Sequence, residues 1–225
     1  MTGAAVASLR ESLPQCEVFG FVDYAAIRPA EEADASTQAT RNGPRALTRL
    51  RGLVGSGLRV SADNVVTFSQ QFDTIGAPGL VVTGGVAFYE LELLSLQGES
   101  IYPQFGWAAT DGFERGRSLA HEGVGDDSCS WAVDGVRVKA WGDGGGPSYG
   151  QAWKEGDIIG LAANLDTGTI SFGLNGSWES PMGTAFDGVQ AGGGLYPALS
   201  GMLRGQLRVR INLGSEPWRY GPPTL

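Results

Sequence analysis

The chain has 225 residues and a mass of 23.5 kDa, enough for one large domain or two small ones with a core that buries well over half of the unfolded surface. Hydrophobic residues make up 42% and charged residues 18%, as in ordinary globular proteins, and the formal net charge is −8. The longest apolar runs fall far short of the roughly 20 residues that a membrane-spanning helix needs. The sequence therefore predicts no membrane span, and its acidity argues against nucleic acids and anionic membranes as partners.

The cysteine content indicates the cellular compartment of the protein. Cys16 and Cys129 are the only cysteines, too few for a disulfide scaffold or a structural zinc site. The N-terminus has no charged region followed by an apolar block, so we expect no secretory signal. We predict an intracellular protein without metal or cofactor. The cytoplasm is favoured, and an organelle stays open as the destination if a targeting peptide has been removed.

Residues 1–56 differ from the rest of the chain. They carry six arginines and six acidic residues, so residues 57–225 carry the whole net charge. A short helix is predicted near 44–54, because Pro44 suits the first helical position and apolar residues recur at helical spacing up to Val54. We interpret this part as an N-terminal extension that contains one short helix.

From about residue 57 the pattern changes to short strand-like runs bounded by Gly, Pro, Asn or Asp. Apolar and charged residues alternate after Tyr89 and after Leu207, which is typical of antiparallel sheets with one wet face. Asp166-Thr-Gly168 and Asn175-Gly176 predict hairpin turns. An all-β sandwich or barrel follows. The candidate strands are 58–60, 64–68, 79–83, 87–94, 104–107, 130–133, 137–141, 157–162, 169–174, 195–199 and 206–211.

The tryptophans divide into two groups by position. Trp107, Trp131 and Trp153 lie in strand or strand-edge motifs, so we expect them in the core. The others follow turns or precede a glycine-rich loop, so they could be half exposed, although packing in the core or at the rim is favoured for each. These are Trp141, Trp178 and Trp218.

The order of motifs along residues 57–220 resembles the SPRY domain. This resemblance implies a bent two-sheet antiparallel β-sandwich of the concanavalin A-like kind, which serves as a protein-interaction module and usually has no catalytic activity. Residues 221–225 are then a C-terminal tail. The motifs are Gly85-Val-Ala-Phe-Tyr-Glu-Leu-Glu-Leu, Gln104-Phe-Gly-Trp107, Gly125-Asp-Asp-Ser-Cys-Ser-Trp131 with Asp134-Gly135, Tyr149-Gly-Gln-Ala-Trp-Lys-Glu-Gly-Asp-Ile-Ile-Gly160, Leu165-Asp-Thr-Gly-Thr-Ile-Ser-Phe-Gly-Leu-Asn-Gly176, Gly183-Thr-Ala-Phe186, Leu195-Tyr-Pro-Ala198 and Ile211-Asn-Leu-Gly214.

The resemblance also implies where a partner binds. Family members that grip short peptides do so where three loops converge at one edge of the sandwich, and by position these loops correspond to 59–64, 118–124 and 200–204. The contact residues differ from the peptide-gripping branch, which has an aromatic residue in the second loop and Val-Trp-Gly in the third. The candidate partner-binding residues are Arg59, Asn64, Arg115, Arg117, Leu119, His121, Met202, Leu203 and Arg204.

The chemistry of these loops suggests a class of ligand. Met202 and Leu203, if exposed, would form an adaptable apolar anchor rimmed by the positive charge of the nearby arginines and His121. Such a surface would favour an acidic or hydroxyl-rich peptide with an aliphatic side chain. The alternative is that Met202 and Leu203 fold inward and close the end of the sandwich.

Catalytic and metal chemistry find little support. Ser148 lies in a Gly-x-Ser-x-Gly pattern, but a turn and a strand follow it, and His121 is the only histidine that could act as a base. We expect the acidic pair at Asp126 to face solvent. The Asn-x-Asp-x-Gly stretch at 164–168 lacks the remaining ligands of a calcium loop, so hairpin chemistry explains it.

The sequence thus predicts a non-catalytic protein-interaction module, in the manner of an adaptor, that binds its partner through loops at one edge. A structural or scaffolding subunit of a large assembly is the alternative, and a serine hydrolase that uses Ser148 is a distant third. The identity of the partner stays open.

Overall fold

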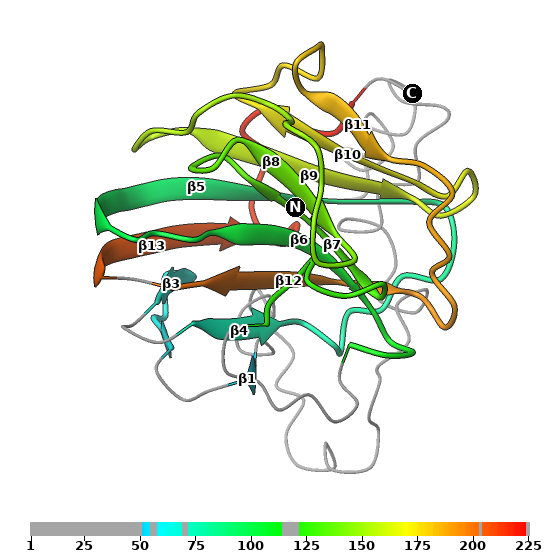
Figure 1. Ribbon diagram of the computed structural model, residues 1–225, viewed down its shortest axis with the longest axis horizontal. Coiled ribbons are helices and arrows are strands. Elements are labelled where there is room, and N and C mark those ends of the chain that lie inside the picture. The colour runs from blue at the N-terminus through cyan, green and yellow to red at the C-terminus, as the bar shows by residue number, and fades with distance from the viewer. Residues whose placement is uncertain (1–50, 55–57, 69–71, 114–121, 203, 224–225) are drawn as a thin grey trace, which may run out of the picture.

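The computed structural model describes residues 51–54, 58–68, 72–113, 122–202 and 204–223. Within them the chain forms two antiparallel sheets and no α-helix, which confirms the predicted all-β sandwich (Figure 1). One sheet has the strand order β1-β4-β12-β6-β7-β8 and the other β11-β10-β9-β5-β13-β3-β2. The strands are β1 (Arg51–Val54), β2 (Arg59–Val60), β3 (Val65–Thr67), β4 (Asp73–Gly76), β5 (Val86–Glu99), β6 (Gln104–Ala109), β7 (Ser130–Asp134), β8 (Lys139–Gly142), β9 (Ile158–Asn164), β10 (Thr169–Leu174), β11 (Gly183–Phe186), β12 (Leu195–Gly201) and β13 (Arg204–Asn212).

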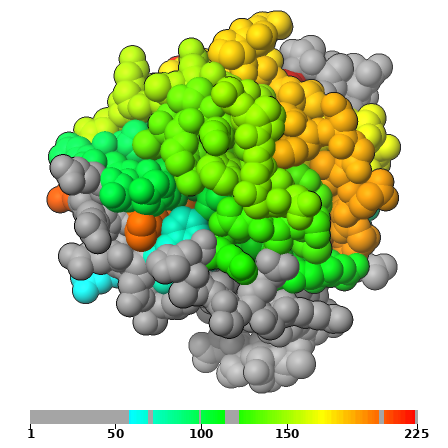
Figure 2. All heavy atoms as spheres, viewed as in Figure 1, coloured from blue at the N-terminus to red at the C-terminus, as the bar shows by residue number. Residues whose placement is uncertain are grey.

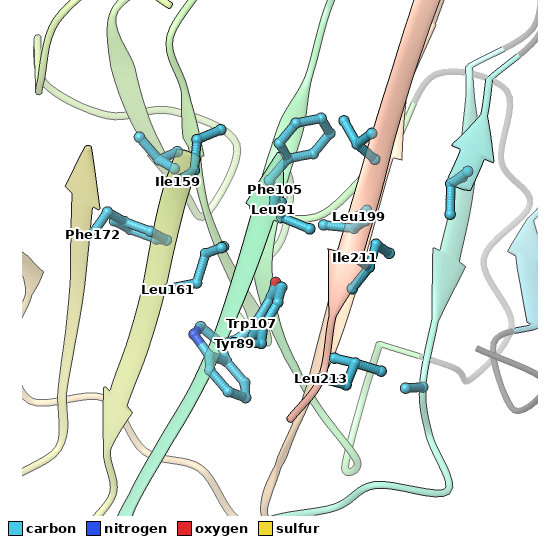
Figure 3. Close-up of a cluster of buried hydrophobic side chains, with 14 of the residues drawn as sticks. Tyr89, Leu91, Phe105, Trp107, Ile159, Leu161, Phe172, Leu199, Ile211 and Leu213 are labelled. Carbon is cyan, nitrogen blue, oxygen red and sulfur yellow. The ribbon is translucent and has the colours of Figure 1, made fainter. Parts of the chain in front are cut away.

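The core lies between the two sheets. Tyr89 and Leu91 of β5 point inward, and Trp107 of β6 meets Tyr89 edge-on with ring centroids 5.0 Å apart (Figure 3). The Tyr89 hydroxyl donates to the Gly106 carbonyl at 2.5 Å, so the one polar atom of this side chain is satisfied inside the core. The predicted inward face of β13 is also buried, through Leu207 and the alternate residues after it. Truncating one of these large side chains to Ala would cost about 3–5 kcal/mol.

Most of the predicted strands are present, as β2, β3, β5–β10, β12 and β13. Residues 79–83 instead begin in a turn and then join the sheet through an isolated bridge between Val82 and Leu195. The sequence pattern does not predict β1, β4 or β11. In β4 the pattern is misleading because Asp73 and Thr74 are polar and yet almost completely buried.

The helix predicted near 44–54 needs a correction. Residues 44–50, like the rest of residues 1–50, lie outside the described residues, but residues 51–54 form strand β1. They pair with β4 in the register Arg51↔Gly76 and Gly52↔Ile75. Helical spacing of apolar residues is a weak preference over so short a segment, and pairing with an existing sheet edge outweighs it.

The two predicted hairpin turns are confirmed. Asn175 and Gly176 both have positive φ, 51° and 81°, as a two-residue type I′ turn requires. Leu174 and Ser177 flank the turn and exchange two backbone hydrogen bonds of 3.0 Å. Gly168 ends the β9–β10 connection with a φ of 67°, the left-handed conformation predicted for it.

The outer face of the seven-stranded sheet is not wet throughout, contrary to the simple alternation pattern. Glu90 of β5 is only 4% exposed, because residues 216–221, here called the C-terminal strap, lie across it. Its carboxylate accepts the backbone N–H groups of Arg219, Tyr220 and Gly221 at 2.6, 2.9 and 2.9 Å. Strap residue Trp218 meets Phe88 edge-on at 4.9 Å, and a groove of about 260 Å³ runs beside the strap.

Candidate functional site

Several turns gather at one end of the sandwich, which we call the loop end. Ser200, near the end of β12, pairs with Gln104 at the start of β6. Phe105 in turn pairs with Val133, near the end of β7. The β5–β6, β7–β8 and β12–β13 turns therefore all lie at this end.

The predicted binding residues are distributed unevenly over the described part of the molecule. Met202 lies half-buried at the loop end, directly after β12, and Arg204 begins β13. Arg59 is exposed on β2. Asn64 accepts a hydrogen bond from the Ile211 N–H at 3.0 Å through its carbonyl, which places it at the opposite end of β3 from Met202. Arg115, Arg117, Leu119, His121 and Leu203 lie outside the described residues.

The described parts of the long β6–β7 connection, residues 110–113 and 122–129, contact the outer face of the six-stranded sheet and its loop end. Phe113 and Val124 of this connection pack with Ala108 and Tyr196 in a second, smaller apolar cluster on that face. Gly123 lies so close to Phe72 and Ser200 that a Cβ atom there would come within 2.5 and 2.7 Å of their side chains. Two of the three predicted loops, the second and the third, are therefore in contact.

A buried hydroxyl network holds this connection in place. The Ser200 Oγ accepts the Val124 N–H at 2.8 Å and shares a hydrogen bond of 2.7 Å with the Thr74 Oγ1, in which either hydroxyl can donate. Ser200 and Thr74 are both fully buried. Strands β4 and β12 thus fix the position of the loop through hydrogen bonds that water cannot replace.

The acidic pair of the Gly125 motif does not face solvent as predicted. Asp126 is half-buried and accepts hydrogen bonds from Gly123 N–H at 2.7 Å and Gln104 Nε2 at 2.9 Å. Burial raises the pKa of Asp126, and these hydrogen bonds oppose the rise. Asp127 is 5% exposed, and its Oδ1 accepts from the Cys129 N–H and the Ser130 hydroxyl. Both carboxylates are occupied in shaping the turn before β7.

An arginine packed between two aromatic rings forms the other part of the loop end. The Arg137 guanidinium lies 4.2 Å from the ring centroid of Trp141 and 4.9 Å from that of Tyr102. It also forms an ion pair with Asp134, whose carboxylate is fully buried; this burial raises the pKa of Asp134, and the arginine opposes the rise. The neighbouring Val136 is 41% exposed. Arginine and aromatic side chains at a surface are typical of protein-binding hot spots.

The sequence pattern did not predict the cluster around Arg137, although it placed Trp141 in the core or at the rim.

All six tryptophans lie as predicted: Trp107 and Trp153 are buried and Trp131 packs against the core. The other three are half-buried. Figure 2 shows the face on which the bright green segment around β7 and β8 lies toward the viewer. The alternation of side chains along a strand could not have found the cluster, because Arg137 lies in the turn before β8 and only Trp141 is on the strand.

Hydrolase chemistry has no matching local structure at Ser148. This serine is exposed in an extended segment and forms an isolated bridge with Lys139 beside β8. A serine nucleophile of this motif needs a sharp turn from a strand into a helix. Within the described ranges no three Cys, His, Asp or Glu side chains come together as a metal site would need, and no helix there has the length and apolarity to cross a bilayer.

The fold and the loop end define a class, the antiparallel sandwich that presents its turns as a binding surface. A comparison with family models finds the SPRY domain over residues 86–216, more than half of the chain. The chain therefore belongs to the SPRY family, as its motifs indicated. SPRY domains bind other proteins, and a protein-interaction module is the function that the family gives to this fold.

Two known proteins illustrate the relationship. The chain is 38% identical over 125 residues to the E3 ubiquitin-protein ligase RKP of Arabidopsis thaliana, a match that covers 52% of this chain and 9% of that protein. It thus spans less than a tenth of the relative's length. The crystal structure of the SPRY domain of human HERC1 matches with a TM-score of 0.57 and 19% identity, over 73% of this chain and 94% of that one. The second likeness supports the fold alone.

Proposed function

We propose that this chain is a non-catalytic adaptor domain that binds a protein partner through the loop end. The observation that carries the proposal is the Arg137 guanidinium packed between Tyr102 and Trp141, next to the exposed Val136 and on the same end as Met202. Contacts with both rings and the ion pair with Asp134 restrain the guanidinium, so less side-chain entropy is lost when a partner binds. Membership of a protein-interaction family supports the same conclusion.

The framework that supports the loop end is buried and hydrogen-bonded. The Ser200 network and the Gly123 contact hold the β6–β7 connection against β12. A surface held in its bound conformation before binding gains affinity because it has little left to order. We propose that partner contacts extend from Val136 and Arg137 across the loop end to Met202 and Arg204.

Substitutions at the two borders of this surface test the proposal. Val136→Asp adds a charge where an apolar contact is expected, and Met202→Ala with Arg204→Ala truncates the other border. The matched control is Thr167→Asp, an exposed position in the β9–β10 hairpin at the opposite end of the sandwich. We expect both loop-end variants to melt near the wild-type temperature and to lose partner capture in affinity purification from native extract. Capture that is equal for all three variants would overturn the proposal.

A permanent subunit of a large assembly is the competing function. In that case the same faces would be buried among neighbours rather than open to a transient ligand. Size-exclusion chromatography of native extract separates the two, because an adaptor elutes in part as a free species and a subunit only at high mass. We propose the adaptor, acting inside the cell and in the cytoplasm; Cys129 is a free thiol, as a reducing compartment allows.

A further inference from the structure

We infer that the open edge of β2 is a second binding surface, which accepts an extended peptide of alternating acidic and aliphatic residues as an added strand. Among the described strands, β2 is the last in the order of the seven-stranded sheet. The surface is separate from the loop-end cluster around Arg137, and the inference does not depend on the proposed function. Addition of a strand to a sheet edge is a general mode of peptide recognition.

The backbone of β2 offers the hydrogen-bonding groups that such a strand needs. The Ser61 N–H donates to the Val65 carbonyl at 2.9 Å, and the register Arg59↔Thr67 and Val60↔Val66 continues from that pair. Hydrogen-bonded and non-hydrogen-bonded pairs alternate in an antiparallel ladder. The N–H and C=O of Val60 therefore point away from β3, toward the open edge.

The inward face at this edge ends in an exposed apolar residue. Val60, Val66 and Val209 form one row across β2, β3 and β13. Val66 and Val209 are fully buried, whereas Val60 is 39% exposed, which is rare for a large apolar side chain in the described residues. An aliphatic side chain on an added strand would extend this row and remove Val60 from water.

The outward face at the same edge is cationic on an otherwise acidic protein. Arg59, Thr67 and Arg208 share one row, and both arginines are exposed. Within the described part of the chain neither forms an ion pair, while Arg210 is paired with Glu92 at 2.6 Å.

Asp63 is an acidic group that interacts with Arg208 of this row. Its pKa is lowered chiefly by a hydrogen bond from Ser61, with smaller contributions from Arg210 and Arg208. Glu155 lies at the other end of the row, where it accepts a hydrogen bond from Ser95, the β5 partner of Arg208. Arg59, on the last described strand, is the cation that an added strand would face. An acidic residue on the added strand would face Arg59, and a basic one would be repelled.

The test uses a fluorescein-labelled synthetic peptide of about eight residues, alternating Glu and Val, with a Lys-Val peptide as its counterpart. Anisotropy titrations with the full chain should show binding of the Glu-Val peptide only, weaker at high salt. Val60→Pro removes the outward N–H at an edge where proline is tolerated. Arg59→Glu with Arg208→Glu reverses the charge.

Both variants should weaken binding by roughly tenfold or more. The charge-matched control Lys154→Glu with Arg219→Glu, and the loop-end variant Val136→Asp, should bind as wild type does.

Two other outcomes overturn the inference. In the first, the Glu-Val peptide does not bind the full chain. In the second, the peptide binds, but neither β2 variant changes its affinity. Protection of the Val60 amide from hydrogen exchange without peptide would place another segment on the edge. If a concentration-dependent dimer, seen by sedimentation, disappears in Val60→Pro, that occupant is a second copy; if the protein is monomeric, the occupant is the protein's own extension.

Discussion

The Glu90 carboxylate in the middle of β5 accepts the backbone N–H of Tyr220 at 2.9 Å, across 130 residues of sequence. Two neighbouring strap N–H groups bind the same carboxylate. A charged acceptor for consecutive N–H groups gives strong hydrogen bonds, and here it substitutes for the sheet partners that the strap lacks. This one side chain thus fixes the end of the described chain to the outer face of the sheet.

Glu90→Ala should release the strap and destabilise the fold by about 1–3 kcal/mol, because three partly buried N–H groups lose their charged acceptor. Chemical denaturation measures the change, and hydrogen exchange of residues 216–221 should rise. The matched control is Glu92→Ala on the same strand face, whose partly exposed ion pair with Arg210 should contribute no more than about 1 kcal/mol. Equal losses in the two variants would contradict this account of the strap.

Ser200→Ala should leave the Val124 N–H buried without an acceptor. We expect a loss of about 1–3 kcal/mol, together with faster hydrogen exchange in the β6–β7 connection. Ser128→Ala, in the exposed part of the same connection, serves as the control and should change stability by less than about 0.5 kcal/mol. An unchanged exchange rate at Val124 in Ser200→Ala would show that the hydroxyl does not hold the loop.

Gly123→Ala tests the close approach of the loop to the sheet. The added Cβ would come within 2.5 Å of Phe72 and 2.7 Å of Ser200, so something must shift, at a cost of about 1–3 kcal/mol. Gly145→Ala is the matched control, because no atom lies within 4 Å of the added Cβ there. Equal melting temperatures for the two variants would contradict the packing described here.

Burial raises the pKa of Asp126 above its ordinary 3.8, so the stability of the fold should depend on pH through this residue. A carboxyl whose pKa is higher in the folded than in the unfolded protein stabilises the fold when protonated. That contribution is complete below 3.8 and is lost as the pH rises through the folded value. The free energy of unfolding of the wild type should therefore fall relative to Asp126→Asn as pH increases from about 3 to about 6.

Urea titrations at each pH measure this difference. The pH-dependent contribution of Asp134 to stability cancels in the difference, because both proteins contain this residue. A difference that stays constant or grows in favour of the wild type would contradict the burial of Asp126.

The sequence pattern was sufficient where local chemistry decides the structure. Alternation in β5 and β13 and the Asn175-Gly176 turn predicted strands and a hairpin correctly, because side-chain period and positive φ are local properties. It was insufficient where distant segments decide. The burial of Glu90 depends on the strap at residues 216–221. Asp73 is a residue type typical of loops, and its place in a strand depends on the position of β4 between β1 and β12.

Part of the candidate site could be predicted from the sequence, and part depends on segments that are distant in the chain. Family motifs located the loop end and Met202 within it. The Arg137 cluster depends on the β5–β6 turn bringing Tyr102 beside the β7–β8 hairpin, and no short sequence window contains both. Asn64 shares a loop with Arg59 in sequence, but the register of β3 places it at the other end of that strand.

The central claim, that the loop end binds a protein partner, is tested most directly by photocrosslinking in intact cells. A photoreactive amino acid is placed at Val136 and, as the control, at Thr167. The account predicts one discrete crosslinked product from position 136 that disappears with Met202→Ala and Arg204→Ala, and none from position 167. The same products from both positions, or a product from position 167 alone, would contradict it.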